Sequence, residues 1–483
     1  MKVGKSMSWS DISERDFFYA YRKAKADAYY ERSLVAAGAF VEFESSLPNE
    51  LLELRRNVLR QGLVKVLAEL PGRVVARGKR LGLRPKRKSR DQDSQSYFSD
   101  PHRAFSELAK SNTVTPELRL IGEFPVEIHV LAALWINLVG HKFDCVLSDA
   151  VFGSRLRRVR RGTPRRGERG RYHLEAVGSF EPYYKPYRQW RSRGLDAIRN
   201  QLAVGGKTVA VTMDLASYYH GIDPRFAVGA SFLRYAGIQL TEWELEFTRS
   251  FVDYLCGWSN QVCERLEAID SKIDSSRLGG LPIGLSISRV LSNCLLVGLD
   301  REIERELHPL YYGRYVDDLF IVLRDTGEIT RGDSLLRYFS SRSRVFRRGR
   351  SKGKSPEWTL DLPDQYQEGS KLILKDAKQK VFFLSGRAGV DLLDTIEKQM
   401  RDVASERRLM PLPEGLASMA SARVLSTAAR GPEEADSLRQ ADGLSVRRLG
   451  WSVQVKAVET LAAMLEVDDW SEGRQRFYEF ARN

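Results

Sequence analysis

Two adjacent carboxylates, Asp317 and Asp318, lie between short apolar runs that are rich in β-forming residues. This pattern predicts a strand, a tight turn and a second strand, with the acids at the turn. Two ionised carboxylates side by side repel each other unless a cation lies between them, and Asp oxygens suit a hard ion such as Mg²⁺. Because Asp is also common in ordinary turns, the pair alone does not distinguish a metal site from a polar hairpin.

A third acid, Asp214, follows the apolar run 208–213, which predicts a buried strand. An acid at such a strand end is well placed to bind a metal, although a lone Asp there is also typical of a cap or turn. Between the two acid sites, residues 278–284 form a turn rich in glycine, and a helix is predicted from about Ser286. Such a turn can receive a phosphate or let a base pair approach the backbone.

Two-metal phosphoryl transfer needs this set of groups. Two divalent ions roughly 3.5–4 Å apart stabilise the attacking and leaving oxygens, and carboxylates from neighbouring strands can bridge both ions. If folding brings Asp214 to Asp317 and Asp318, the glycine turn would shape the seat of a template and an incoming base pair. The pattern therefore indicates nucleotidyl transfer.

The composition favours a nucleic-acid partner. The 483 residues carry a net charge of +14, which suggests a polyanion, and nucleic acid before a membrane. Basic residues gather in three clusters, at 72–90, 157–171 and 341–354. No apolar run has membrane-spanning length, no signal-peptide core follows Met1, and the four cysteines form no CxxC pair. These features predict a reducing, cytoplasmic location.

Periodicity gives a coarse secondary-structure prediction. Apolar residues at three-to-four spacing predict helices over 1–70 and from Val390 onward. Residues 358–385 are predicted to form two strands, the second of which includes 372–384.

Taken in chain order, these features resemble motifs A, B and C of the palm of reverse transcriptases. Residues 211–219 are similar to motif A, residues 280–288 to motif B, and residues 315–318 to the family's YxDD box. Three matches in order are far more specific than any one of them. Ile283 departs from the pattern, because the family often has Gln there and an apolar side chain cannot make the amide's hydrogen bonds.

The resemblance implies an α+β fold, that of a right-hand polymerase with fingers and a palm built on an antiparallel sheet with helices. It implies an N-terminal helical and basic region at 1–118, fingers at 119–206 and a palm at 207–388. Residues 389–483 would then form a helical thumb or C-terminal extension.

The resemblance also implies roles for single residues. Asp214, Asp317 and Asp318 match the catalytic metal ligands, together with the backbone carbonyl of Leu215, and they would hold two Mg²⁺ ions, with Mn²⁺ as an alternative. Tyr219 falls where the family keeps a steric gate against the ribose 2′-OH, which favours dNTPs.

Five further residues are candidates for nucleotide binding. Gly284 belongs to the motif B match, and Lys378 resembles a motif D lysine near the leaving pyrophosphate. Arg155, Lys185 and Arg188 are candidate triphosphate contacts from the fingers, and each could equally be an ordinary surface charge.

Three details narrow the resemblance to prokaryotic reverse transcriptases of the "unknown group", which include abortive-infection and other anti-phage enzymes. They are residues 217–224, the element 152–156 and the arginine-rich insertion that follows it. Several such enzymes work with a non-coding RNA and form oligomers. The expected function is therefore an RNA-directed DNA polymerase in anti-phage defence, bound to RNA, DNA product and dNTPs, with a homo-oligomer as an expected assembly.

The same motifs are compatible with other functions. A retron or group II intron type reverse transcriptase would share the motifs, as would a template-independent or protein-primed polymerase. An RNA-binding scaffold with an idle palm is a further alternative, but it has no need of three clustered acids.

Overall fold

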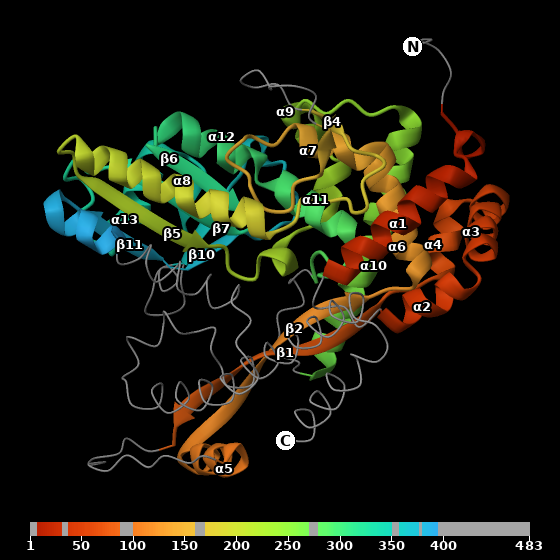
Figure 1. Ribbon diagram of the computed structural model, residues 1–483, viewed down its shortest axis with the longest axis horizontal. Coiled ribbons are helices and arrows are strands. Elements are labelled where there is room, and N and C mark those ends of the chain that lie inside the picture. Colours follow the sequence, from red (N-terminus) through yellow and green to blue (C-terminus); the bar gives the residue numbers. More distant parts are fainter. Residues whose placement is uncertain are drawn as a thin grey trace, which may run out of the picture. The chain divides into compact units, whose positions relative to one another are not determined.

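The computed structural model describes most of the chain up to residue 394. The described ranges are 7–30, 37–86, 100–159, 170–269, 279–349, 357–375 and 379–394. Over these residues the chain combines helices with small antiparallel sheets, and the predicted α+β class is confirmed (Figure 1). The predicted thumb or extension at 389–483 lies outside the described residues from 395 onward.

The chain divides into two compact units. The first unit comprises Met1–Arg77 and Leu118–Leu393, and the second comprises Gly78–Glu117 and Asp394–Asn483. The N-terminal helices therefore belong to the same unit as the candidate site. The physical reason is that α1 (Glu14–Tyr30) packs along α6 (Val126–Trp135), whose side chains are buried all round.

The predicted helical character of the N-terminal part is confirmed. After α1 come α2 (Ala37–Ser45), α3 (Leu47–Gln61) and α4 (Leu63–Glu69). The apolar run that predicts one helix up to Leu70 is interrupted at Gly62, which has a φ of +83° and so ends α3 where an L-residue would be strained.

In the second unit, the described residues form a helix and parts of two long strands. The chain enters this unit within β1 (Arg73–Pro85) and leaves it within β2 (Asn112–Glu123), and the two strands pair. Helix α5 (Pro101–Ser111) begins at Asp100, whose carboxylate accepts the N–H groups of His102 and Arg103 at 3.1 Å. Most of the first basic cluster, at 72–90, lies in β1.

The first unit contains a four-stranded antiparallel sheet. Its order is β11 (Lys380–Leu384), β5 (Thr208–Asp214), β7 (Asp318–Arg324) and β6 (Tyr311–Tyr315). The apolar runs of β5 and β7 are buried almost without alternation, which indicates cover on both faces. Helix α8 (Tyr184–Ala203) packs along β5, β6 and β7 (Figure 1).

The first unit contains further helices and short strands. They are η1 (Trp9–Asp11), η2 (Ile136–Gly140), α7 (His141–Cys145), β3 (Arg158–Val159), β4 (Arg171–Tyr172), η3 (Tyr218–Gly221), η4 (Pro224–Val228), α9 (Ala230–Ala236), α10 (Glu242–Ile269), α11 (Ser286–Leu295), α12 (Val297–Glu306), α13 (Gly332–Arg342), β8 (Phe346–Arg348), β9 (Glu357–Leu360), η5 (Pro363–Gln365) and β10 (Ile373–Lys375).

The second strand predicted within 358–385 is two strands. β10 pairs with β9 in a three-stranded sheet with β8, whereas β11 pairs with β5. A helix covers 386–394, in agreement with the helical pattern predicted from Val390 onward. Among the described helices, none combines the length and the apolar character needed to cross a bilayer.

Candidate active site

Strand pairing brings the acids of the two distant segments together. β5 and β7 run antiparallel in a register that sets Asp214 opposite Asp318. Side chains of directly opposed residues on an antiparallel pair are roughly 4.5–5.5 Å apart at Cβ. Asp317 lies next to this pair, and the backbone N–H of Leu215 donates to the Asp317 carbonyl at 3.4 Å. The three acids form one carboxylate site at the end of the sheet.

The predicted hairpin with acids at its turn is also found. β6 ends at Tyr315 and β7 begins at Asp318, so Val316 and Asp317 form the turn. Val316 has a φ of +60°, a left-handed conformation that β-branched residues rarely adopt. Such strain persists only where surrounding contacts fix it, and it is frequent at functional sites.

Arg314 supplies one of those contacts. Its guanidinium is fully buried, and Nη1 donates to the Val316 carbonyl at 2.9 Å. Nε and Nη2 form a bidentate ion pair with Asp300 at 2.7 and 2.6 Å, and further hydrogen bonds reach Asn293. The Tyr312 hydroxyl donates to Asp300 at 2.6 Å. Because the Arg314 guanidinium is fully paired, its charge is tolerated in the core. Its hydrogen bonds connect the turn at Val316 to α11 and α12.

Charge repulsion is the main electrostatic property of the carboxylate site. Burial, and then the charges of Asp318 and Asp214, raise the pKa of Asp317 to about 7. A carboxylate whose ionisation is opposed by two neighbouring acids gains most from a divalent cation, so the donor chemistry fits Mg²⁺. As placed, no three His, Cys, Asp or Glu side chains in the described part of the chain converge on one point. Metal binding therefore requires the carboxylates to turn toward a shared ion.

The glycine turn, residues 279–284, is fixed against the segment that follows β5. The N–H of Leu281 donates to the Tyr219 carbonyl at 2.8 Å, and the N–H of Gly280 donates to the Ser259 hydroxyl at 2.9 Å. Gly280 has a φ of +76°, and a Cβ there would lie 2.2 Å from the Tyr219 carbonyl oxygen. Only glycine permits this close approach of the turn to the Tyr219 carbonyl.

Replacing Gly280 with Ala is expected to lower the free energy of unfolding by about 3 kcal/mol or more, because strain at positive φ adds to the backbone clash. Gly237 is a matched control, since it has the same φ of +76° but open space around its Cα. Gly237→Ala should cost about 1 kcal/mol from strain alone. Denaturant unfolding of both variants measures the difference, and equal losses would contradict the described packing.

Tyr219 is held beside the same turn. It is half-buried in η3, and its hydroxyl oxygen accepts a hydrogen bond from the Ser292 hydroxyl at 3.1 Å. The hydroxyl of neighbouring Tyr218 donates to the Ser292 carbonyl at 2.5 Å. Helix α11 therefore fixes both rings, and Tyr219 follows the carboxylate site by only a few residues.

Gly284 faces the N-terminal part of the chain. It lines a small cavity with Asp27, His129 and Arg289. The buried Asp27 Oδ2 and His129 Nε2 have no hydrogen-bond partner among the described residues. The glycine turn therefore lies close to α1 as well as to Tyr219 and Ser259, and sequence patterns do not indicate this proximity to α1.

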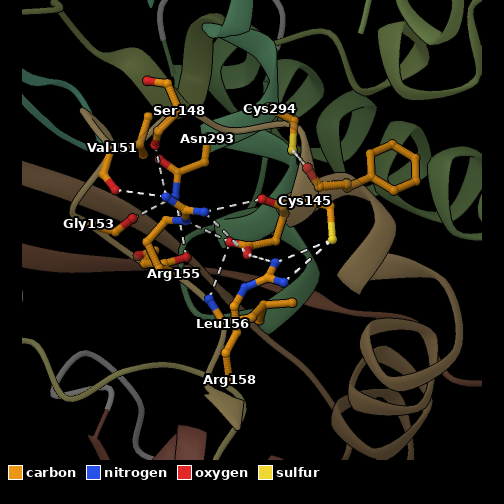
Figure 2. Close-up of polar contacts among 12 residues, drawn as sticks. Cys145, Ser148, Val151, Gly153, Arg155, Leu156, Arg158, Asn293 and Cys294 are labelled. Carbon is orange, nitrogen blue, oxygen red and sulfur yellow. Dashed lines mark hydrogen bonds and ion pairs between the residues drawn. The ribbon is translucent and has the colours of Figure 1, made fainter. Parts of the chain in front are cut away.

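Arg155, a predicted triphosphate contact, donates hydrogen bonds within the protein (Figure 2), and the predicted role stays a prediction. Nε donates to Asp144 Oδ1 at 2.9 Å, and Nη1 donates to the carbonyls of Ser148 and Val151, both at 3.0 Å. Nη2 donates to the Asp144 carbonyl at 3.3 Å. The Arg155 guanidinium therefore stabilises the loop at 148–156. Arg158 binds the same acid, because its Nη2 lies 2.5 Å from the Asp144 carboxylate.

The other predicted nucleotide contacts are less constrained. Lys185 and Arg188 are exposed on the first turns of α8, and Lys378 lies outside the described residues. The centre of the Tyr187 ring lies 5.2 Å from that of Tyr315, so this end of α8 adjoins the hairpin of β6 and β7. Lys185 and Arg188 remain predictions.

Comparison with known proteins adds no identification. A scan against protein-family models and a search of curated proteins both find no match to this chain.

Proposed function

We propose that the chain is an RNA-directed DNA polymerase that acts in bacterial anti-phage defence, in the cytoplasm and on a bound RNA. One observation carries the proposal: Asp214 and Asp318 are opposed across β5 and β7, with Asp317 in the adjoining turn. Three acids kept together against their mutual repulsion are costly unless a cation uses them. The net charge of +14 supports a polyanionic partner.

Each group near this site has a defined task in the proposed reaction. Bound Mg²⁺ would stabilise the charge that develops on the attacking and leaving oxygens. Asp214, Asp317 and Asp318 would hold the ions, and the fixed ring of Tyr219 would exclude a ribose 2′-OH. The glycine turn lets a template or a base pair approach the backbone closely.

The direct test is DNA synthesis by the chain purified with the RNA that accompanies it. Supplied with dNTPs and Mg²⁺, it should make DNA whose sequence is complementary to that RNA. A product with no match to the RNA would favour template-independent synthesis. Synthesis that survives Asp317→Asn would overturn the assigned site.

A further inference from the structure

The first turns of α8 expose three tyrosines within five residues. Tyr183, Tyr184 and Tyr187 are 53%, 65% and 36% exposed. Large aromatic rings are usually at least partly covered in a folded chain, and a contiguous exposed group of them marks an interaction surface. We call these three residues the α8 tyrosine surface.

The surface is ordered and continuous with the catalytic hairpin. The centre of the Tyr187 ring lies 5.2 Å from that of Tyr315, and the two rings meet edge-on. It lies 5.5 Å from the ring centre of Trp190, which is buried. The ring centres of Tyr183 and Tyr184 are 6.2 Å apart. The Tyr315 hydroxyl donates to the Tyr183 carbonyl at 3.5 Å. Little side-chain entropy is lost when a flat ligand stacks on rings already held in this way.

The charge around the tyrosines is positive. Lys185 and Arg188 are exposed between them, and the Arg191 guanidinium lies 5.5 Å from the centre of the Tyr187 ring. No acid occurs between Glu181 and Asp196. Aromatic rings interleaved with cations are the combination that stacks bases while holding the phosphates between them.

We propose that the α8 tyrosine surface binds single-stranded RNA, with bases stacked on the rings and phosphates on Lys185 and Arg188. A duplex cannot use the surface, because its bases are already stacked and paired. The choice of RNA rests on the proposed function, in which an unpaired template must reach the neighbouring turn. The stacking itself does not depend on that function.

Fluorescence anisotropy with a labelled, unstructured RNA tests the surface. The full chain, stripped of nucleic acid and carrying Asp317→Asn, is titrated without dNTPs, so that binding is measured apart from synthesis. Tyr184→Ala and Tyr187→Ala should each weaken binding roughly tenfold, and Tyr184→Phe should not. Tyr29→Ala is the matched control, because Tyr29 is also 65% exposed but lies on α1. Equal affinity of Tyr184→Ala and Tyr29→Ala would overturn the proposal.

Salt dependence separates stacking from charge. The tyrosine variants should lose affinity at every salt concentration with an unchanged slope, whereas Lys185→Ala should reduce the slope by about one. The same titrations use duplex RNA and single-stranded DNA of the same sequence. An equal loss on duplex RNA would overturn stacking, and tighter binding of the DNA would overturn the assignment to RNA.

Discussion

Replacing Asp317 with Asn should abolish DNA synthesis, by at least about 10³-fold, while leaving the fold no less stable than the wild type. The amide keeps the size of the side chain but cannot supply an anionic ligand. Synthesis is measured with the RNA-bound chain, dNTPs and Mg²⁺. The exposed Asp253 on α10 provides the control, since Asp253→Asn removes a carboxylate far along the chain from the sheet.

The expected stability of Asp317→Asn follows from the pKa of Asp317. Burial and two neighbouring acids raise it to about 7, above the roughly 3.9 expected for an unfolded chain. Between these values the folded state binds more protons, so stability falls as pH rises from 4 to 7 and stays low above that. Without divalent ions, Asp317→Asn should therefore unfold at a higher temperature than the wild type at pH 8. The difference should shrink at pH 5, and a lower unfolding temperature at pH 8 would contradict the account.

Replacing Arg314 with Met is expected to cost about 3–5 kcal/mol in the free energy of unfolding, because it leaves Asp300 buried without its partner. Denaturant unfolding measures the loss. The Arg342–Glu328 pair offers a control, since both side chains are at least one-third exposed, and Arg342→Met should cost less than about 1 kcal/mol.

A double variant separates the fold from the positioning of the turn. Arg314→Met combined with Asp300→Leu replaces the ion pair with apolar groups and should recover most of the stability. DNA synthesis should stay low, because the hydrogen bond from Arg314 to the Val316 carbonyl is still missing. If activity returned together with stability, Arg314 would be a structural residue only.

Local sequence signals predicted the hairpin well, because the apolar runs and the acids that define it are adjacent along the chain. They could not give the pairing of β5 with β7, which joins distant segments and fixes Asp214 opposite Asp318. That convergence was an expectation from the order of the motifs. The register of the sheet depends on the packing of both faces, which a pattern along one strand does not contain.

For two arginines, Arg155 and Arg314, the sequence pattern does not indicate the hydrogen-bond partners that the structure shows. Arg155 looked like a surface charge able to reach a phosphate, yet buried Asp144 and nearby carbonyls take up its N–H groups. Arg314 drew no prediction, although a charge within a predicted strand is a signal that a buried partner exists. In both cases the partner is an acid that the pattern around the arginine does not reveal.

The same limit applies to residues 372–384. They were predicted to lie in one strand, but β10 pairs with β9 and β11 pairs with β5, so the two strands belong to different sheets.

Binding of Mn²⁺, followed by electron paramagnetic resonance, tests directly whether Asp214, Asp317 and Asp318 hold a metal. The chain is stripped of nucleic acid and titrated with a non-hydrolysable dNTP analogue present. We expect that the wild type binds Mn²⁺ and that Asp214→Asn and Asp317→Asn each weaken this binding at least tenfold. Equal binding by the wild type and both variants would show that these carboxylates hold no catalytic metal.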